Sequence, residues 1–511
     1  MSKNEKILNN TLALYIRLLV TVVLNLYATR ILLKNLGVED FGLYGALAGV
    51  IALFSFFQTA LSNASNRFLN IEMEKGTISY IQKIFSTAFF LHIFIALFFC
   101  ILIKIFGALV INFFVKLPIE KINIALQVFN LSILSLFFLV ITIPFESILM
   151  AKEKFGIYAL ISVLDVTLKL VLAYALIFLP HDKLLYYASG FVCIVFLIRL
   201  TYVVYSQLNI VEARVKFHID NDFLKKIINF ISWDLYLSFS KVFKVEGIML
   251  LMNNFFGLIA VASVKISYQI NAALYSLSGN LLVAVKPQLM RSYADYDVDR
   301  MNVLTFYSAK YSYYLMLIFC APIILNIDYI MKFWLGSPPD YAKVITVFVL
   351  ISSLIEVVFE PIVILIHATG NVKKYCFLTG TVIFLSVPLV YFIFKFGFDY
   401  HYAYIVYALN TTLAAFLNLW IAKKMINDFD VSKFFMNVLV NIIITTSTII
   451  LILKAIAEFV IVSDFVGFLI IFMLETLVVI SLIYGLGIEK AHKKLVKSYL
   501  KSKIKCYFRS N

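Results

Sequence analysis

Charge is scarce in this sequence. Only 14% of its 511 residues are Asp, Glu, Lys or Arg, whereas 62% are hydrophobic. A soluble protein of this size needs far more polar surface to cover its core, so the composition excludes a soluble globular chain. Apolar runs of about 20 residues recur along the whole length, and a helix of that length crosses a bilayer. The sequence therefore predicts an all-α polytopic membrane protein.

Cysteine is also scarce, and a phosphate-binding glycine loop is missing. The five cysteines lie far apart and four fall inside apolar runs, which fits neither a disulfide framework nor a metal site. They are Cys100, Cys193, Cys320, Cys376 and Cys506. We therefore expect no metal and no cofactor. Without a phosphate loop or an ATPase domain, we expect an H⁺ or Na⁺ gradient, or the membrane potential, to supply energy instead of ATP.

The polar breaks between the apolar runs are short, so no folded extramembrane domain is expected. The first run is too long for a signal peptide and no small-residue cleavage site follows it, so we expect it to remain as a span. We predict fourteen spans, at about 11–33, 41–63, 84–110, 123–148, 156–180, 184–206, 230–253, 258–285, 307–331, 342–366, 373–394, 400–422, 434–456 and 464–486.

Lys and Arg are distributed unevenly between the two ends of the spans. With the N-terminus inside, 29 of the 44 lie in inner loops and tails, and nine lie in outer loops. This asymmetry satisfies the positive-inside rule, so the sequence predicts that both termini are cytoplasmic. We interpret the net charge of +15 as an orientation device and an attraction to anionic lipids, not as a nucleic-acid footprint.

Two pairs of similar segments indicate an internal duplication. "KILN" at 6–9 and "KIIN" at 226–229 each precede a span, and the helix-ending glycines Gly37 and Gly257 follow at the same distance, an offset of 220. Six spans separate the copies, so both enter the membrane from the same side. We therefore expect parallel repeats with a cleft between two six-helix lobes.

The second pair of segments agrees with the first. "ITIPFESILMAKEKFGIY" (141–158) matches "VFEPIVILIHATGNVKKY" (358–375) at an offset of 217, which aligns Pro144 with Pro361. The predicted organisation is an N-lobe with spans 1–6 (1–206), a cytoplasmic linker (207–229), a C-lobe with spans 7–12 (230–424), an appended pair of spans (425–487) and a basic cytoplasmic tail (488–511). The tail is expected either to lie on the inner leaflet as an amphipathic helix or to be solvated.

Five of the cations within predicted spans lie at different depths on three of the helices. At about 1.5 Å per residue, Arg17 lies in the inner third, Lys241 and Lys244 near the middle, and Arg30 and Lys265 in the outer third. Each costs roughly 2.5–3.5 kcal/mol near the bilayer centre, so such residues normally face a bundle interior, a partner or water. A cavity with excess positive charge binds anions. We predict that these five residues line an anion site.

Structural pairing is the alternative explanation for some of the charges within the spans. The candidate pairs are Asp234 with Lys241 on one helix face, Glu246 with Lys265 on adjacent spans, and Asp165 with Lys169 at i and i+4. Paired charges of this kind stabilise a helix bundle without binding a transported substrate.

Acidic residues form a second group of candidates. Glu356 and Glu360 lie one turn apart, just before the helix-distorting Pro361. They and Asp234 are candidates for coupling to H⁺ or Na⁺. The alternative for Glu360 is a bond to backbone groups freed by the proline. Glu475 has no evident partner in the sequence.

One stretch carries a family resemblance. "NNTLALYIRLLVTVVLNLYATRILLKNLGVEDFGLYGALAGVIALFSFF" (9–57), continuing into "LSNASNRFLNIEMEKG" (61–76), resembles bacterial polysaccharide-export proteins of the Wzx type. These are O-antigen flippases of the multidrug/oligosaccharidyl-lipid/polysaccharide (MOP) superfamily. "LKKIINFISWDLYLSF" (224–239) looks like the family's entry into its second lobe, and the fourteen spans agree over essentially the whole chain.

The resemblance implies transfer of an undecaprenyl-pyrophosphate-linked oligosaccharide between leaflets of the bacterial inner membrane. It also implies the V-shaped fold of multidrug exporters, alternating access, and a place in lipopolysaccharide or other surface-polysaccharide biosynthesis. Membrane lipids, a polysaccharide polymerase and glycosyltransferases would then be its partners. From the residues, a pyrophosphate held by Arg17, Lys241 and Lys244 in the inter-lobe cleft fits this function.

Two other classes of function remain open. A cation-coupled multidrug antiporter shares the fold, although its N-lobe cavity should favour acidic residues rather than Arg17 and Arg30. An integral-membrane glycosyltransferase, polymerase or ligase needs a sizeable periplasmic loop with catalytic side chains. The longest outer breaks have about a dozen residues, and His181 and His401 are isolated. We therefore do not expect an enzyme.

Overall fold

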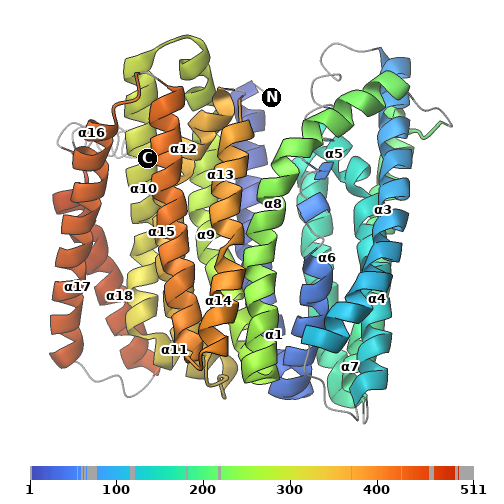
Figure 1. The fold of residues 1–511 in the computed structure, drawn as a ribbon, viewed down its shortest axis with the longest axis horizontal. Helices are drawn as coiled ribbons and strands as arrows, with labels where there is room; N and C mark the ends of the chain where they lie inside the picture. The colour runs from blue at the N-terminus through green and yellow to red at the C-terminus, as the bar shows by residue number, and fades with distance from the viewer. Residues whose placement is uncertain are drawn as a thin grey trace, which may run out of the picture. The chain divides into compact units, whose positions relative to one another are not determined.

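The computed structural model describes residues 3–53, 56–58, 61–62, 65, 69, 77–114, 121–152, 154–179, 182–216, 220–369, 371–426, 428–459, 465–489 and 493. Within these ranges the regular elements are all helices, and no residue lies in a β-strand (Figure 1). The all-α prediction is therefore confirmed. The basic tail, except for residues 488, 489 and 493, lies outside the described residues.

The chain divides into two compact units. The first comprises Met1–Gln269, Met331–Thr346 and Val372–Asn410, and the second comprises Ile270–Ile330, Val347–Asn371 and Thr411–Asn511. The division falls within three long helices, α9 (Leu258–Ala294), α12 (Ala342–Ala368) and α15 (Tyr400–Met425). Each of these helices therefore contributes residues to both units.

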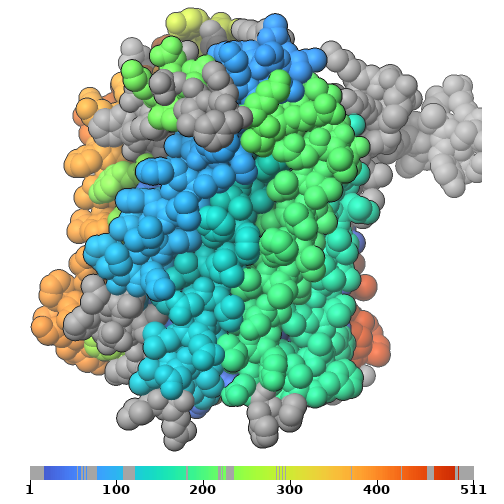
Figure 2. Space-filling view, turned by 90° about the vertical axis from the view of Figure 1, so that its right-hand side faces the viewer, coloured from blue at the N-terminus to red at the C-terminus, as the bar shows by residue number. Residues whose placement is uncertain are grey.

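The remaining helices of the first unit hold the N-terminal half of the chain and a later pair. They are α1 (Lys3–Ala52), α3 (Ile78–Phe114), α4 (Ile122–Ile141), α5 (Ile143–Ala151), α6 (Phe155–Ala175), η2 (Leu176–Phe178), α7 (Lys183–Asn209), η3 (Val211–Ala213), α8 (Asn221–Phe256), α13 (Lys373–Phe384) and α14 (Ser386–Lys395). Within this unit α3, α4 and α7 lie side by side on one face, coloured blue, cyan and green in Figure 2.

The second unit holds the C-terminal helices. They are α10 (Val298–Leu325), the start of α11 (Ile327–Leu335, whose residues from Met331 onward belong to the first unit), α16 (Val431–Phe434), the π-helical η4 (Phe435–Val440), α17 (Asn441–Phe459), α18 (Phe465–Leu482) and the π-helical η5 (Ile483–Gly487). Here α18 packs on both α10 and α17 (Figure 1).

The helices are long and apolar enough to make this a multi-pass membrane protein. Twelve helices of the described chain meet the length and hydropathy of a membrane span. The difference from the fourteen predicted spans has two sources. The stretch Arg17–Ala52 counts once although it covers parts of the first two predicted spans, which are two helices joined at the Gly37 kink. Helix α8 is not among the twelve because it carries several charged residues.

Three predicted spans are broken into two helices, each a few residues from a proline. Pro144 follows the break between α4 and α5, and Pro388 follows the break between α13 and α14. Pro322 precedes Asn326, which separates α10 from α11. A proline inside a helix removes one backbone hydrogen bond and crowds the preceding turn, so these breaks have a local cause. Pro361, in contrast, lies inside an uninterrupted α12.

Gly37 and Gly257 have nearly the same backbone conformation. Gly37 kinks α1 with φ 77° and ψ 168°, and Gly257 ends α8 with φ 82° and ψ −172°. Residues other than glycine rarely adopt such a φ, because their Cβ collides with the backbone. The offset of 220 therefore joins two turns of the same geometry, each between two membrane helices.

The helices flanking these turns also pack alike. In the first unit α1 packs extensively on α6, and α8 packs extensively on α13. The offset of 217 that aligns Pro144 with Pro361 also aligns Tyr158, near the start of α6, with Tyr375, near the start of α13. Both copies therefore contain the same pairing of a turn-flanking helix with the helix that follows the proline.

The connection between α7 and α8 is held against its neighbours. Gln82 Nε2 donates to the carbonyl oxygen of Val211 at 2.8 Å, and the Asp220 backbone N–H donates to Thr87 Oγ1 at 2.9 Å. Asp220 also caps α8, which begins earlier than the predicted start near 230. These bonds fix the residues that precede α8.

An ion pair adds to this attachment. Lys152 Nζ donates to Glu212 Oε1 at 2.6 Å. Partial burial alone would raise the pKa of Glu212, but the hydrogen bond from Lys152, a backbone hydrogen bond and the positive charge of Lys152 lower it below its ordinary value. The carboxylate is therefore ionised at neutral pH.

Candidate functional site

Thirteen charged and aromatic side chains within the helices of the first unit form two clusters. The first, which we call the α6–α7 cluster, consists of Arg17, Glu146, Tyr158, Asp165, Lys169, Arg199 and Tyr202. The second, the α8–α9 cluster, consists of Lys244, Glu246, Lys265, Tyr268, Tyr404 and Tyr407. Each combines cations, carboxylates and tyrosine rings.

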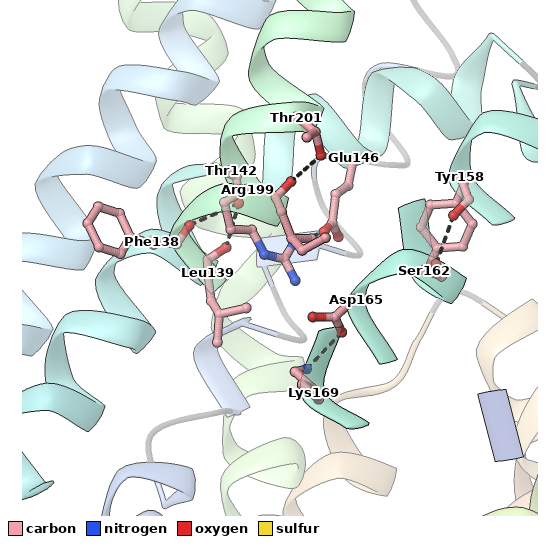
Figure 3. Close-up of polar contacts among 11 residues, drawn as sticks. Phe138, Leu139, Thr142, Glu146, Tyr158, Ser162, Asp165, Lys169, Arg199 and Thr201 are labelled. Carbon is pink, nitrogen blue, oxygen red and sulfur yellow. Dashed lines mark hydrogen bonds and ion pairs between the residues drawn. The ribbon is translucent and has the colours of Figure 1, made fainter. Parts of the chain in front are cut away.

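The break between α4 and α5 positions Glu146. Thr142 Oγ1 donates to the carbonyl oxygens of Phe138 at 2.9 Å and Leu139 at 3.2 Å, which use up its hydroxyl at the end of α4. Helix α5 then restarts at Ile143, and Glu146 in its first turn forms an ion pair with Arg199 of α7 (Figure 3). The proline break thus directs a carboxylate toward the neighbouring helix.

A second ion pair lies on α6, next to the first in Figure 3. Lys169 Nζ lies 2.7 Å from Asp165 Oδ2, which confirms the predicted i, i+4 pair. Lys169 Nζ also lies 5.1 Å from the centroid of the Phe191 ring on α7. The cations Lys169 and Arg199 therefore each have a carboxylate partner in the described chain.

Arg17 is the third cation of the α6–α7 cluster. Its guanidinium lies 4.9 Å from the centroid of the Tyr158 ring, and that ring lies 6.3 Å from the ring of Tyr202. Arg17 makes no ion pair with any described residue, and its buried Nε has no hydrogen-bond partner among them. A ring attracts a guanidinium without neutralising it. The cluster thus holds three cations and two carboxylates, and Arg17 carries the excess charge.

The α8–α9 cluster lies against glycines of α1. Lys265 Nζ lies 3.5 Å from Glu246 Oε2, which confirms the predicted pair. A Cβ on Gly45 would lie 3.1 Å from Lys265 Cγ, and one on Gly49 would lie 3.0 Å from Glu246 Oε2. Two glycines on one face of α1 therefore allow the charged pair to pack directly against the helix.

Lys265 packs against the residue that is its own counterpart in the repeat. Gly45 and Lys265 are 220 residues apart, which is the offset of the two glycine turns. In a two-fold arrangement, a residue in contact with its own counterpart lies beside the axis that relates the copies. We interpret the contact of Gly45 with Lys265 as marking that pseudo-axis within the first unit.

Tyrosine rings surround the second cation of this cluster. Lys244 is buried at 7% exposure, and its Nζ lies 3.6 Å from the centroid of the Tyr407 ring. Tyr268 hydrogen-bonds to Tyr407, and the neighbouring Tyr404 has a buried hydroxyl without a hydrogen-bond partner among the described residues. The charge of Lys244 is thus held at an aromatic surface.

The other two predicted cations, Arg30 and Lys241, lie on the described surface. Both are exposed, and Arg30 makes no ion pair with a described residue. The side chain of Asp234 lies outside those that the structure describes. Of the five predicted cations, the structure therefore places Lys244 and Lys265 in one cluster and Arg17 in another.

The predicted acidic pair lies in the second unit, on α12. Glu360 Oε1 accepts a hydrogen bond from Tyr275 Oη at 3.2 Å. Glu356 is half-buried and makes no hydrogen bond or ion pair with a described residue. Glu475, for which the sequence offered no partner, accepts a hydrogen bond from Asn326 Nδ2 at 2.6 Å. That partner could not be foreseen because it lies on a distant helix.

The acidic side chains do not group into a metal site. In the part of the chain that the structure describes, no three His, Cys, Asp or Glu side chains are arranged to hold a metal ion. The carboxylates of both clusters instead face cations.

Sequence reasoning missed Arg199 and Glu146 as site residues. The sequence groups Arg199 with the inner-side cations, whereas its side chain is 18% exposed and engaged by Glu146. A signal did exist in the sequence, since Glu146 follows Pro144 by two residues and a proline break redirects the side chains that follow it.

Comparisons with known proteins identify the fold. A MATE family multidrug resistance transporter of the MOP superfamily, in an inward-facing conformation, matches with a TM-score of 0.66 and 15% identity over 80% of this chain and 95% of that one. The lipid II flippase MurJ, in an inward closed conformation, matches with a TM-score of 0.66 and 16% identity over 93% of this chain and 99% of its own.

A third match agrees with these two. A MOP superfamily transporter from Pyrococcus furiosus has a TM-score of 0.55 and 14% identity, over 83% of this chain and 96% of that one. No family model and no curated protein sequence matches the chain. The chain therefore has the fold of MOP superfamily transporters, and the three matched structures are described as transporters or a flippase, not as enzymes.

Proposed function

We propose that this protein translocates an undecaprenyl-pyrophosphate-linked oligosaccharide, a repeat unit of O-antigen or another surface polysaccharide, across the bacterial inner membrane by alternating access. One observation carries the proposal. Arg17 lies over Tyr158 without an ion pair to any described residue, whereas Lys169 and Arg199 in the same cluster each face a carboxylate. An anionic substrate would neutralise the excess positive charge of this cluster.

The chemistry of a pyrophosphate suits such a position. A guanidinium presents a planar fork of donors that matches phosphate oxygens, and it stays charged at any physiological pH. In a medium that excludes water, the attraction between the two is stronger than at a surface. Arg17 would hold the pyrophosphate, while Lys244 and Lys265 of the α8–α9 cluster would offer further positive charge, together with the exposed Arg30 and Lys241.

The fold is consistent with a lipid-linked passenger. One matched structure bears the name lipid II flippase, and that match covers 93% of this chain. The cavity of such a transporter must accept a charged head group while an apolar tail stays in the bilayer. Cytoplasmic N- and C-termini, and supply of the passenger by glycosyltransferases before a polymerase consumes it, belong to the same proposal.

Ion coupling would use the acidic residues. Glu356 and Glu360 on α12, with Asp234 on α8, are the proposed carriers of H⁺ or Na⁺. Glu356 has no partner among the described residues, and Glu360 is held by Tyr275. The membrane potential contributes about 2.3 kcal/mol per charge per 100 mV, so movement of one charge is enough to bias the cycle.

A cation-coupled multidrug antiporter is the second candidate. The half-buried Glu356 and Glu360 within a span favour it, because an acidic pair of this kind attracts cations. The two functions differ in the sign of the passenger's charge. Competition by lipophilic cations would favour the antiporter, and competition by polyprenyl pyrophosphates would favour the flippase.

The test is transport of a fluorescent polyprenyl-pyrophosphate oligosaccharide by the protein in liposomes. Protection from a membrane-impermeant quencher reports which leaflet holds the dye. Arg17→Ala should lower transport about 10- to 100-fold, the equivalent of one lost charge-assisted hydrogen bond. Arg17→Lys should keep part of the activity.

A matched control is Lys34→Ala, since Lys34 is also a cation of α1 but is exposed, lies outside both clusters and has no place in the proposed site. It should retain most of the activity. Equal transport by Arg17→Ala and wild-type protein, with both inserted at the same level, would refute the assignment of Arg17. A double Lys241→Ala/Lys244→Ala variant with normal transport would remove those two lysines from the proposal.

A further inference from the structure

A groove between α3 and α4 combines an apolar floor with two polar side chains at one end. Its volume is about 410 Å³, and it is lined by Leu97, Cys100, Lys104, Asn130, Ile133, Leu134 and Phe137. The two helices that line it are blue (α3) and cyan (α4) on the face of the first unit that Figure 2 shows. None of these residues belongs to either charged cluster.

The two polar residues have no partner in the described chain. Lys104 and Asn130 are both exposed, and neither makes a hydrogen bond or an ion pair with a described residue. A polar group that faces lipid must be satisfied internally or by the head-group region. A lysine and an amide that share one groove therefore call for an external anionic group that accepts hydrogen bonds.

The depth of these residues matches the edge of the hydrocarbon layer. Helix α3 has 37 residues, about 55 Å, and the span Ile122–Ala151 has 30 residues, about 45 Å. When each is centred on a hydrocarbon core of about 30 Å, Lys104 and Asn130 both lie about 3–5 Å inside its edge. A lysine stem extends from there to the level of lipid phosphates.

The rest of the groove runs deeper into the membrane. Leu97 and Phe137 each lie seven residues from the polar pair along their helices, about 10 Å farther toward the bilayer centre. Cys100 donates to the carbonyl oxygen of Ile133 at 3.8 Å and so leaves no free donor within the floor. The groove thus has a polar end near the head groups and an apolar end among the acyl chains.

We infer that this groove binds an anionic phospholipid of the surrounding bilayer. Its phosphate lies against Lys104 Nζ and Asn130 Nδ2, and one acyl chain follows Leu134 and Phe137. Charge complementarity decides the class of lipid, because a zwitterionic lipid brings its own cation next to Lys104 whereas phosphatidylglycerol does not. This site is independent of the passenger proposed above.

The test is native mass spectrometry of the full chain, delipidated and then titrated with phosphatidylglycerol or phosphatidylcholine. Wild type should retain phosphatidylglycerol preferentially. Lys104→Ala should weaken that retention about fivefold, as expected for loss of one lysine near the surface. Lys104→Arg should restore it, and Lys34→Ala, which removes another exposed lysine outside the groove, should not change it.

A pair of tryptophan variants separates the groove from general surface charge. Leu134→Trp fills the groove, whereas Leu126→Trp places the same ring on the same helix outside it, and the two leucines are 43% and 41% exposed. Only Leu134→Trp should reduce phospholipid retention. Unchanged retention in both Lys104→Ala and Leu134→Trp would overturn the inference. Displacement of phosphatidylglycerol by an equimolar polyprenyl phosphate would overturn the choice of occupant.

Discussion

The two copies of the repeat are alike in their backbones and different in their charges. Gly37 and Gly257 make the same turn, and α1 packs on α6 as α8 packs on α13. At the same offset of 220, however, the counterpart of Arg17 is the buried Leu237, and the counterpart of Lys265 is Gly45. The fold therefore forms around these helix pairs whether or not a cation is present.

This difference distinguishes residues that the fold requires from residues that have a functional role. A side chain that the fold required would be needed at both equivalent positions, since both copies build the same pairing. Arg17, Lys244, Glu246 and Lys265 each occur in one copy only. We conclude that these charges have a function specific to their own half of the repeat. For Arg17, the proposed function is to bind the pyrophosphate of the substrate.

The largest expected effect comes from a variant that places the arginine of the first copy at the equivalent position of the second copy. Leu237→Arg puts a guanidinium at a site that is 4% exposed, where its counterpart Arg17 has Tyr158. We expect a loss of about 3 kcal/mol in the free energy of unfolding, the cost of an arginine within a span. Reversible denaturation in detergent, followed by tryptophan fluorescence, measures it.

The opposite exchange is the control for that variant. Arg17→Leu gives the first copy the apolar residue of the second, so it should keep the thermal midpoint of wild type and lose transport. A stable, well-folded Leu237→Arg protein would show that the two positions are not equivalent.

Close helix contact in the α1 glycine face provides the next test. A Cβ on Gly42 would collide with the backbone carbonyl group of Leu258 on α9, which cannot swing aside as a side chain can. Gly42→Val should therefore cost about 1–3 kcal/mol. Gly279→Ala, in α9, meets no described atom within 4 Å and should leave stability the same or raise it by up to about 1 kcal/mol. Equal midpoints for both variants would contradict the packing.

The two glycine turns should respond equally to substitution. At both Gly37 and Gly257, no described atom lies within 4 Å of the position that a Cβ would take, so only the backbone conformation opposes a side chain. Gly37→Ala and Gly257→Ala should each cost about 1–3 kcal/mol. Thermal midpoints of the two variants, measured side by side, should agree, and a large difference would show that the two turns contribute differently to stability.

The smallest effect concerns the connection between the copies. The lowered pKa of Glu212 means that its pair with Lys152 contributes stability above the unfolded-state pKa of about 4.3, and that this contribution is lost as the pH falls through the folded-state pKa. Because both side chains are partly exposed, the effect should stay below about 1 kcal/mol. The difference in thermal midpoint between wild type and Glu212→Gln should shrink below about pH 4, and a difference that is constant with pH would exclude the pair as its source.

The features that the sequence predicted are those with short-range causes. The spans follow from apolar run length, the Gly37 and Gly257 turns from local backbone geometry, and the Asp165–Lys169 pair from helical spacing. Even the Glu246–Lys265 pair joins adjacent helices across one turn. Each depends on residues close together in the chain.

The features that sequence reasoning missed depend on helices far apart in the chain. Arg199 meets Glu146, Lys244 meets Tyr407 and Asn326 meets Glu475 only after the helices pack. No periodicity in one helix specifies which face of a distant helix it will meet. Predicting that Arg17 carries the excess charge also required knowing that both neighbouring cations are already paired.

The turns at Gly37 and Gly257 have a consequence for the chirality of the chain. At both positions the place of an L residue's Cβ is open, so only the positive φ opposes an L residue, and that φ suits a residue of D configuration. A semisynthetic protein with D-alanine at both positions should therefore fold at least as well as the natural chain. Handedness, and not size or polarity, is what these two sites select.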